Sequence, residues 1–247
     1  MDVVGDLLAR DRRSRATALV TPDGRERTYR DLITNAYKAA NVFRYLGARA
    51  GSTVAVEPAP GLHTTLGFLG AAGVGAPVRF DPAAGIERGD RVVLVDVADE
   101  AATEPAPGTG LAAFGGPPER PETTHWEQEL WSENPGTPPS AVGPDDPVVR
   151  GSDGSESNRT GDVSHRALLE AAASVVDARG LGPGDRVRLR GDLADPRALA
   201  AGVVAPLAAG ATSVLAGAQP AGTEPTVTVD GGNGDPRPVT LPSVGGP

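Results

Sequence analysis

Residues 151–165 read GSDGSESNRTGDVSH, and an apolar helical pattern, RALLEAAASVVDA, follows directly. A small, hydroxyl-rich loop that leads into a helix N-terminus is a common way to hold phosphate, because exposed backbone N–H groups and the positive end of the helix dipole both favour an anion. This loop also carries three carboxylates, at Asp153, Glu156 and Asp162, and it contains no lysine. It is therefore a working phosphate cradle, a degraded one, or an ordinary polar loop.

Few other residues could carry chemistry. The chain has no cysteine, which excludes disulfides, thiolate metal sites and a cysteine nucleophile. His63, His125 and His165 lie far apart in sequence and show no metal-ligand spacing. Asp192 and Asp195 could join His165 as general acids and bases, but carboxylates just before a helix more often cap it.

The charge pattern indicates the solvent conditions of the protein more clearly than it indicates a binding partner. The net charge is −9, and 22 of the 23 basic residues are arginine, the exception being Lys38 on the expected solvent face of an early helix. An acidic, lysine-poor chain suits concentrated salt, where the Debye length is only about 3 Å at 1 M. A GC-rich genome, which favours Arg, Ala, Gly and Pro, is the alternative explanation. No basic stripe for nucleic acid is present.

Composition predicts a soluble, cytoplasmic protein. No stretch approaches the 18 or more apolar residues of a membrane helix, and the opening MDVVGDLLARDRR does not read as a signal peptide. At 247 residues the chain is long enough for one large or two small domains. Because only 4% of the residues are aromatic, the core must consist mainly of Ala, Val and Leu.

Residues 1–96 alternate helical and strand patterns, which predicts an α/β fold with a largely parallel sheet. Apolar residues recur at helical spacing from Tyr29 to Leu46, and Gly47 stands where a C-cap glycine belongs. The elements expected next are a strand, a helix, a strand and a further strand, at residues 53–57, 62–72, 77–80 and 91–96.

Residues 97–147 interrupt this alternation. They hold ten prolines, and their acidic residues are opposed by a single arginine, Arg120, so we expect an acidic linker or a loosely packed excursion. Within it, Trp126 and Trp131 of HWEQELW form either a short amphipathic anchor or a chance helical turn. Residues 217–247 form a Pro/Gly-rich tail with little to bury.

Residues 148–216 return to α/β patterning and resemble the first zone. LGARAGSTVAV, a helix and PVRF occur about 135 residues before LGPGDRVRL, a helix and TSVL. A helix, a glycine turn, a strand, a helix and a strand thus occur twice in the same order. The repetition predicts two α/β subdomains, related by a pseudo-two-fold axis, that bury a shared interface.

These segments carry a family resemblance. TYRDLITNAYKAANVFRYLGARAGSTVAV and GLHTTLGFLGAAGVGAPVRFDP resemble the opening of the adenylate-forming enzymes, the AMP-forming acyl-CoA synthetases and their relatives. That family runs T-Y-x-E-L, a helix ending in L-G, then G-D-x-V, a helix and a strand ending in N-P. RALLEAAASVVDARGLGPGDRVRL and AGVVAPLAAGATSVL resemble its second subdomain. The resemblance covers most of residues 1–95 and 148–216, and it implies the family's large N-terminal domain, whose two subdomains are pseudo-repeats.

The resemblance supplies a template for the opening loop, because the family's phosphate loop reads T-S-G-T-T-G-x-P-K-G. In register with it, the weak phosphate-binding set of this chain is Ser152, Gly154, Ser155, Ser157, Arg159, Thr160, Gly161 and Ser164. Ser157 replaces a glycine, which costs backbone freedom to wrap a phosphate. Thr160 replaces the lysine, and Arg159 stands in for it only partly, with a different reach and shape. The cradle is therefore degraded.

Other family landmarks are missing. Ala194 and Asp195 stand where the family has an aromatic-histidine pair, and the sequence beyond them contains no Y-G-x-T-E, no T-G-D and no C-terminal lid with its lysine. We therefore expect a non-catalytic protein of the synthetase fold with no catalytic residues and no metal, acting on a protein partner or as a homo-oligomer. The alternative is a weak nucleotide or CoA binding module, or half of an acyl-CoA ligase that needs a partner chain. Only the family resemblance implies ATP or AMP as a cofactor.

Overall fold

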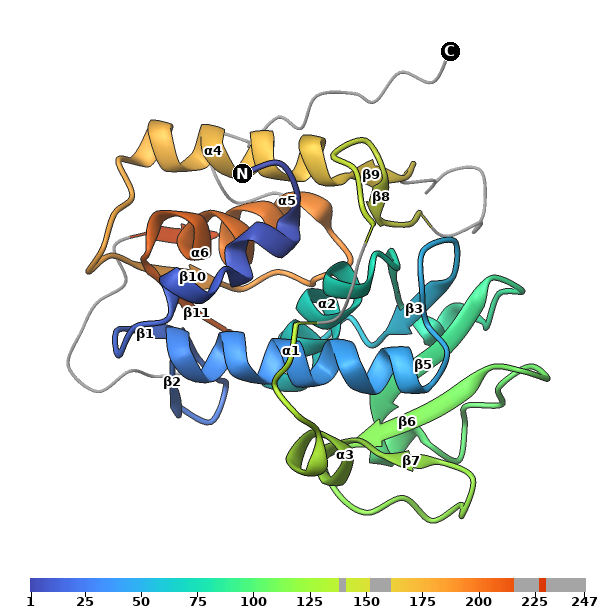
Figure 1. The fold of residues 1–247 in the computed structure, drawn as a ribbon. Coiled ribbons are helices and arrows are strands. Elements are labelled where there is room, and N and C mark those ends of the chain that lie inside the picture. The colour runs from blue at the N-terminus through green and yellow to red at the C-terminus, as the bar shows by residue number, and fades with distance from the viewer. Residues whose placement is uncertain (138–140, 152–160, 216–226, 230–247) are drawn as a thin grey trace.

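The computed structural model describes residues 1–137, 141–151, 161–215 and 227–229 (Figure 1). Their strands form two sheets. The five-stranded sheet has the order β12 (Val227–Val229), β10 (Arg186–Leu189), β11 (Thr212–Val214), β1 (Thr17–Val20) and β2 (Glu26–Thr28). The seven-stranded sheet has the order β7 (Thr124–His125), β6 (Gly110–Phe114), β5 (Asp90–Asp96), β3 (Thr53–Val56), β4 (Val78–Phe80), β8 (Pro147–Val149) and β9 (Val163–Ser164). All pairs are parallel except β1–β2 and β8–β9.

Helices connect the parallel strands. The α-helices are α1 (Tyr29–Tyr45), α2 (Leu62–Val74), α3 (Trp126–Ser132), α4 (His165–Arg179), α5 (Pro196–Leu199) and α6 (Ala205–Ala209), with a π-helical turn, η5 (Ala200–Val204), between the last two. Short 3-10 helices are η1 (Val4–Leu8), η2 (Arg10–Arg12), η3 (Pro82–Ala84) and η4 (Val97–Asp99). Helix α1 begins with a reciprocal cap, in which Thr28 Oγ1 accepts from the Asp31 N–H and the Asp31 carboxylate accepts from the Thr28 N–H.

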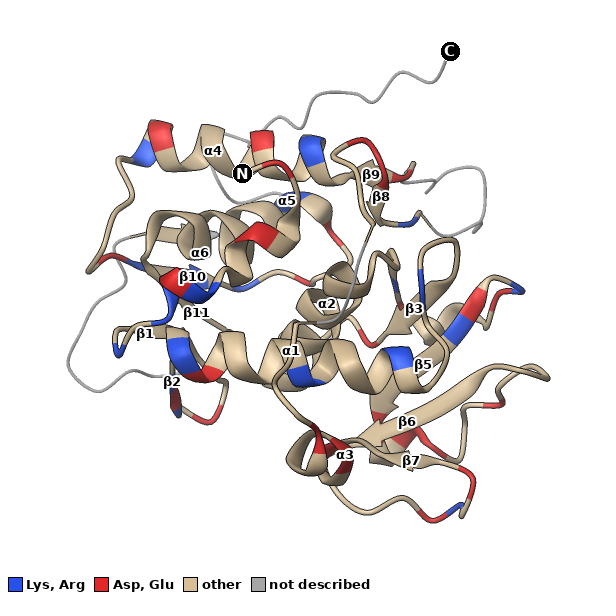
Figure 2. Cartoon of the chain, viewed as in Figure 1, with Lys and Arg blue, Asp and Glu red and all other residues tan. Residues whose placement is uncertain are grey.

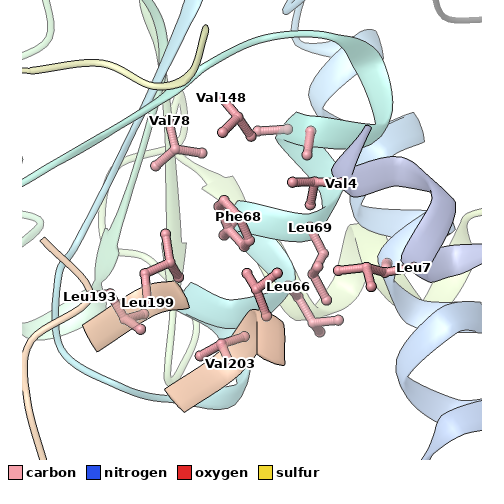
Figure 3. Close-up of a cluster of buried hydrophobic side chains, with 14 of the residues drawn as sticks. Val4, Leu7, Leu66, Phe68, Leu69, Val78, Val148, Leu193, Leu199 and Val203 are labelled. Atoms are coloured by element: carbon pink, nitrogen blue, oxygen red, sulfur yellow. The ribbon is translucent and has the colours of Figure 1, made fainter. Parts of the chain in front are cut away.

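One hydrophobic core joins both sheets to these helices. Helix α2 is central to it, because Leu66, Phe68 and Leu69 lie at most 2% exposed among side chains from several other elements. Figure 3 shows Val4 and Leu7 of η1 on one side of this helix and Leu199 and Val203 of the α5–η5 helix near its other end. The N-terminal segment and the last helices therefore meet on α2.

The expected α/β fold is confirmed. The helix expected to start at Tyr29 is α1, and Gly47 after it adopts the left-handed φ of 92°. The repeated order is also present. The first unit runs α1, β3, α2, β4, and the second unit runs α4, β10, α5–η5–α6, β11, each ending in a parallel strand pair.

The helix of the second unit contains an irregular turn at a proline. Pro206 has no N–H to donate to the carbonyl four residues earlier, so the carbonyl of Gly202 lacks its usual helical partner. Ser213 of β11 donates its hydroxyl to that oxygen at 2.6 Å. Gly202 also allows close approach to β10, since an added Cβ would lie 2.8 Å from Leu189 Cδ1.

The segment expected to be an acidic linker is largely folded. Within residues 97–147, β6 pairs with β5 over five residues, and its Leu111, Ala112 and Ala113 are buried. Trp126 is fully buried and contacts Phe43 of α1 with ring centroids 5.0 Å apart. Folded elements stand here in place of the expected linker or loosely packed excursion, because the acidic residues lie on loops and on α3, while a short Ala-rich strand supplies the buried face.

The anchor interpretation of HWEQELW is confirmed for one of its two tryptophans. Helix α3 packs through Trp126 and Leu130, whereas Trp131 is 86% exposed. Lys38, expected on a solvated face, donates from Nζ to the carbonyls of Leu130 at 3.0 Å and Trp131 at 3.4 Å. The single lysine therefore fastens α3 to α1.

The two sheets also exchange strands across the expected boundaries. Strands β1 and β2, from the first expected subdomain, join the sheet of the second unit, because β1 pairs with β11. Strand β8, from the second expected subdomain, pairs with β4 of the first. Within the expected tail, residues 227–229 form β12 beside β10.

Charged residues surround this core unevenly (Figure 2). Acidic residues concentrate on α3 and on the loops beside β5, β6 and β7, while the N-terminal turn η2, drawn in front of β10, carries Arg10 and Arg12. Among the described residues, no helix is long and apolar enough to cross a membrane.

Candidate functional site

A cavity of about 400 Å³ opens where β4, β8 and the start of α5 meet. Phe80 and Asp81 follow β4, Arg150 and Gly151 follow β8, and Asp195 precedes α5, so both repeated units contribute to its walls. The carboxyl ends of parallel strands are the usual place for ligands in α/β sheets. This cavity is therefore the candidate site.

The predicted phosphate-binding set is only partly within the described residues. Ser152, Gly154, Ser155, Ser157, Arg159 and Thr160 lie outside them. Gly161 lines the cavity. Ser164 caps α4 as predicted, with its Oγ accepting from the Ala167 N–H at 3.2 Å. The loop thus begins and ends at this cavity, and its last hydroxyl is already used by the helix.

The two ends of the loop are fastened to each other by Asp162. Its Oδ1 accepts from the Gly151 N–H at 3.1 Å, and its Oδ2 lies 4.0 Å from Arg150 Nε. A backbone N–H and a guanidinium are the groups that a phosphate would use. In this chain a carboxylate of the protein accepts from that N–H and lies near the guanidinium, whose Nε has no hydrogen-bond partner among the described residues. Nothing in the sequence pattern marked Arg150, because its proximity to Asp162 arises only when β8 and β9 pair.

The opposite wall of the cavity is acidic. It carries Asp81, Asp192 and Asp195. Burial raises the pKa of the Asp192 carboxyl, and the neighbouring charges of Asp81 and Asp195 raise it further, although a hydrogen bond from the Ala194 N–H opposes the shift. Asp81 holds a left-handed φ of 70°, a conformation rare outside glycine. The site therefore repels anions on this side.

The proposed acid–base set does not assemble. Asp195 caps α5, accepting from the Arg197 N–H at 2.9 Å, as carboxylates before helices usually do. His165 is 1% exposed, and its Nδ1 accepts from the Val4 N–H at 3.1 Å, which ties α4 to η1. Burial lowers the pKa of His165 to about 4, against the opposing charges of Asp146 and Asp6. It is thus a neutral structural residue.

No three His, Asp or Glu side chains in the described part of the chain are placed to hold a metal ion. The three aspartates of the acidic wall are therefore not a preformed cation site. What this arrangement offers chemically is a small acidic cavity with one arginine, Arg150, at its wall.

Solved structures share this fold. The chain is similar to an anthranilate CoA ligase, AuaEII, in complex with anthranoyl-AMP, with a TM-score of 0.73 and 21% identity over 86% of this chain and 44% of that one. It is similar to an acyl-CoA synthetase of Brucella canis, with a TM-score of 0.72 and 21% identity over 86% of this chain and 42% of that one. A third likeness is to the nonribosomal peptide synthetase FmoA3 bound to α-methyl-L-serine-AMP, with a TM-score of 0.68 and 23% identity over 86% of this chain and 23% of that one.

These likenesses confirm the fold resemblance to the N-terminal part of adenylate-forming enzymes. The chain spans less than half the length of the structures that it matches. No protein-family model matches it, and no curated protein matches it either.

Proposed function

We propose that this chain is a non-catalytic member of the adenylate-forming fold, which acts by binding another protein or a second copy of itself. The observation that supports this most is the position of Asp162, whose carboxylate accepts the Gly151 N–H at the mouth of the phosphate loop and lies 4.0 Å from Arg150 Nε. We infer that Asp162 competes with a nucleotide phosphate for the Gly151 N–H.

The acidic wall of the cavity also disfavours a bound phosphate. Asp81, Asp192 and Asp195 face the space that a ligand phosphate would enter. At an effective dielectric of 20, two like charges about 6 Å apart repel by roughly 3 kcal/mol, before screening by salt. Adenylation relies on positioned positive charge around the phosphates. A site with this charge balance works against the reaction.

Pyrophosphate exchange tests the proposal directly. We expect the purified chain to show no acid-dependent exchange of labelled pyrophosphate into ATP with aliphatic, aromatic or amino acids. Restoring the family's loop residues with Ser157→Gly and Thr160→Lys should improve ATP binding without producing exchange. Acid-dependent exchange by the unaltered chain would overturn the proposal.

A second candidate is half of an acyl-CoA ligase that needs a partner chain. It is favoured by the coverage, since 86% of this chain corresponds to only 44% of the matched ligase. Strand β12 lies at the end of its sheet, with β10 as its neighbour among the described strands, so a further strand could pair there. Exchange that appears only when a second chain carrying the rest of the ligase fold is added would favour this candidate over the first.

A further inference from the structure

A second, larger cavity lies away from the candidate site. It has a volume of about 740 Å³ and opens between β2, α1, the start of α2 and α3. The two cavities have no lining residue in common. Its size is within the range of small-molecule sites, roughly 300–1,000 Å³.

Its charge is opposite to that of the candidate site. The lining includes three cations, Arg25, Arg27 and Lys38, against two carboxylates, Asp31 and Glu127. The lining thus has an excess of one positive charge in a chain of net charge −9. It favours an anionic ligand.

Most of these charges are already engaged. Lys38 holds the carbonyls of Leu130 and Trp131, and Arg25 lies 3.1 Å from Asp23. Asp31 belongs to the cap of α1. Arg27, by contrast, is half-buried on β2, and its side chain has no hydrogen-bond or ion-pair partner among the residues that the structure describes.

A histidine and a glutamate form the far end of the cavity. His63 stacks on Phe114 with ring centroids 5.1 Å apart, and its Nε2 lies 3.6 Å from Glu127 Oε1. Glu127 is fixed in place because it accepts from the Gly115 N–H at 2.6 Å. His63 Nδ1 is buried and, in the described part of the chain, has no hydrogen-bond partner. Burial lowers the pKa of His63, the charge of Glu127 opposes this shift, and the charge of Arg27 adds to it. Arg27 and His63 both line this cavity.

The remaining walls are apolar. Leu62 and Leu66 of α2 and Leu130 of α3 line the cavity, and Trp131 stands at its rim with 86% of its surface exposed. An exposed tryptophan beside leucines offers a flat apolar contact surface. The cavity thus combines one unpaired guanidinium with an apolar surface.

We propose that this cavity binds a monoanionic organic acid with a flat apolar body, whose carboxylate pairs with Arg27 and whose body lies against Leu62, Leu66, Leu130 and Trp131. A guanidinium and a carboxylate match geometrically, through two parallel hydrogen bonds. The nearby Asp31 and Glu127 oppose a second negative charge, so a dianionic phosphate ester of the same body should bind less well.

Calorimetric titration with three naphthalene compounds tests this assignment. They share one ring system and differ in charge at neutral pH: 2-naphthoate is a monoanion, 2-naphthyl phosphate carries nearly two charges, and 2-naphthol is neutral. We expect saturable binding of 2-naphthoate, tighter than that of either other compound. Arg27→Gln should weaken 2-naphthoate at least tenfold, about 1.4 kcal/mol, and change 2-naphthol by no more than about twofold.

Two further variants keep the test decisive. Arg44→Gln on the exposed end of α1 removes the same charge outside the cavity and should leave 2-naphthoate binding within about twofold. Trp131→Ala alters only an exposed side chain, so it should fold normally and weaken both 2-naphthoate and 2-naphthol. Absence of saturable 2-naphthoate binding, equal losses in the two arginine variants, or tighter binding of the phosphate ester would overturn the proposal.

Discussion

The two repeated units have the same order of elements but are completed by different parts of the chain. The first unit, α1 to β4, is extended by β5, β6, β7 and α3, which follow it in sequence, and by β8 from beyond them. The second unit, α4 to β11, is extended by β1 and β2 from the start of the chain and by β12. The repeat therefore specifies a local βαβ pattern, and the strands that extend each sheet come from other parts of the chain.

The units also differ in how their helices pack. In the first, α2 approaches α1 at Gly70, where an added Cβ would lie 2.8 Å from Ala39 Cβ. In the second, a π-helical turn and the hydroxyl of Ser213 accommodate Pro206. Both units nevertheless bring aspartates to one cavity, Asp81 from the first and Asp192 from the second. The shared topology thus positions a site, and the residues at the strand ends determine what it can bind.

The largest expected effect concerns the extension of the first unit. Trp126→Ala should lower the free energy of unfolding by about 3–5 kcal/mol, because it empties a fully buried aromatic site beside Phe43. Trp131→Ala, on the same helix but exposed, should change it by less than about 0.5 kcal/mol. Urea denaturation measures both, and equal effects would show that α3 is not anchored through Trp126.

The next effect concerns the attachment of the second unit to the N-terminus. Because His165 has a folded pKa of about 4, its neutral form is favoured in the folded protein. Its contribution to stability is complete above the unfolded pKa of about 6.5 and is lost as the pH falls toward 4, by a total on the order of 2–3 kcal/mol. His165→Asn keeps an acceptor for the Val4 N–H but does not titrate. Unfolding measured from pH 7 to 4 should therefore be less pH-dependent in this variant, and an unchanged slope would contradict the assignment.

A smaller effect separates two glycines of α2. Gly70→Ala should destabilise the protein by about 1–2 kcal/mol, since its Cβ would also lie 2.9 Å from the backbone nitrogen of Ala40. Gly73→Ala meets only Ala40 Cβ at 3.4 Å, so it should be neutral or stabilising by up to about 1 kcal/mol through helix propensity. Thermal melts of the two variants, compared with the parent, test the close contact of α1 and α2 in the first unit. Similar melting temperatures for the two variants would rule out a close contact of α1 and α2 at Gly70.

The smallest effect is that of salt on the whole chain. We propose that the protein is adapted to concentrated salt, as its net charge of −9 and single lysine suggest. Screening should then raise the melting temperature by a few degrees between about 0.1 and 2 M KCl. A melting temperature that stays constant or falls with added KCl would favour genome composition as the cause of the arginine bias.

The sequence was most informative where a pattern was long. The helical spacing from Tyr29 and the cap at Ser164 predicted α1 and α4, because apolar positions that repeat over several turns are a stronger signal than the preference of any single residue. Strand β6 was missed because GLAAF is short and lies among prolines and acids, and its burial depends on pairing with β5. The same limit applied to the site. The pattern marked Ser164 and Gly161, but the proximity of Arg150 to Asp162 and of Arg27 to His63 exists only in the folded chain.

The central claim is that carboxylates of the protein itself disfavour nucleotide phosphate in the candidate site. Calorimetric titration with ATP, comparing the parent chain with the Asp162→Asn, Asp192→Asn variant, tests it most directly. We predict millimolar binding at best for the parent, about 4 kcal/mol, and at least tenfold tighter binding for the variant. Micromolar binding by the parent, or no gain in a variant that remains folded, would contradict the account.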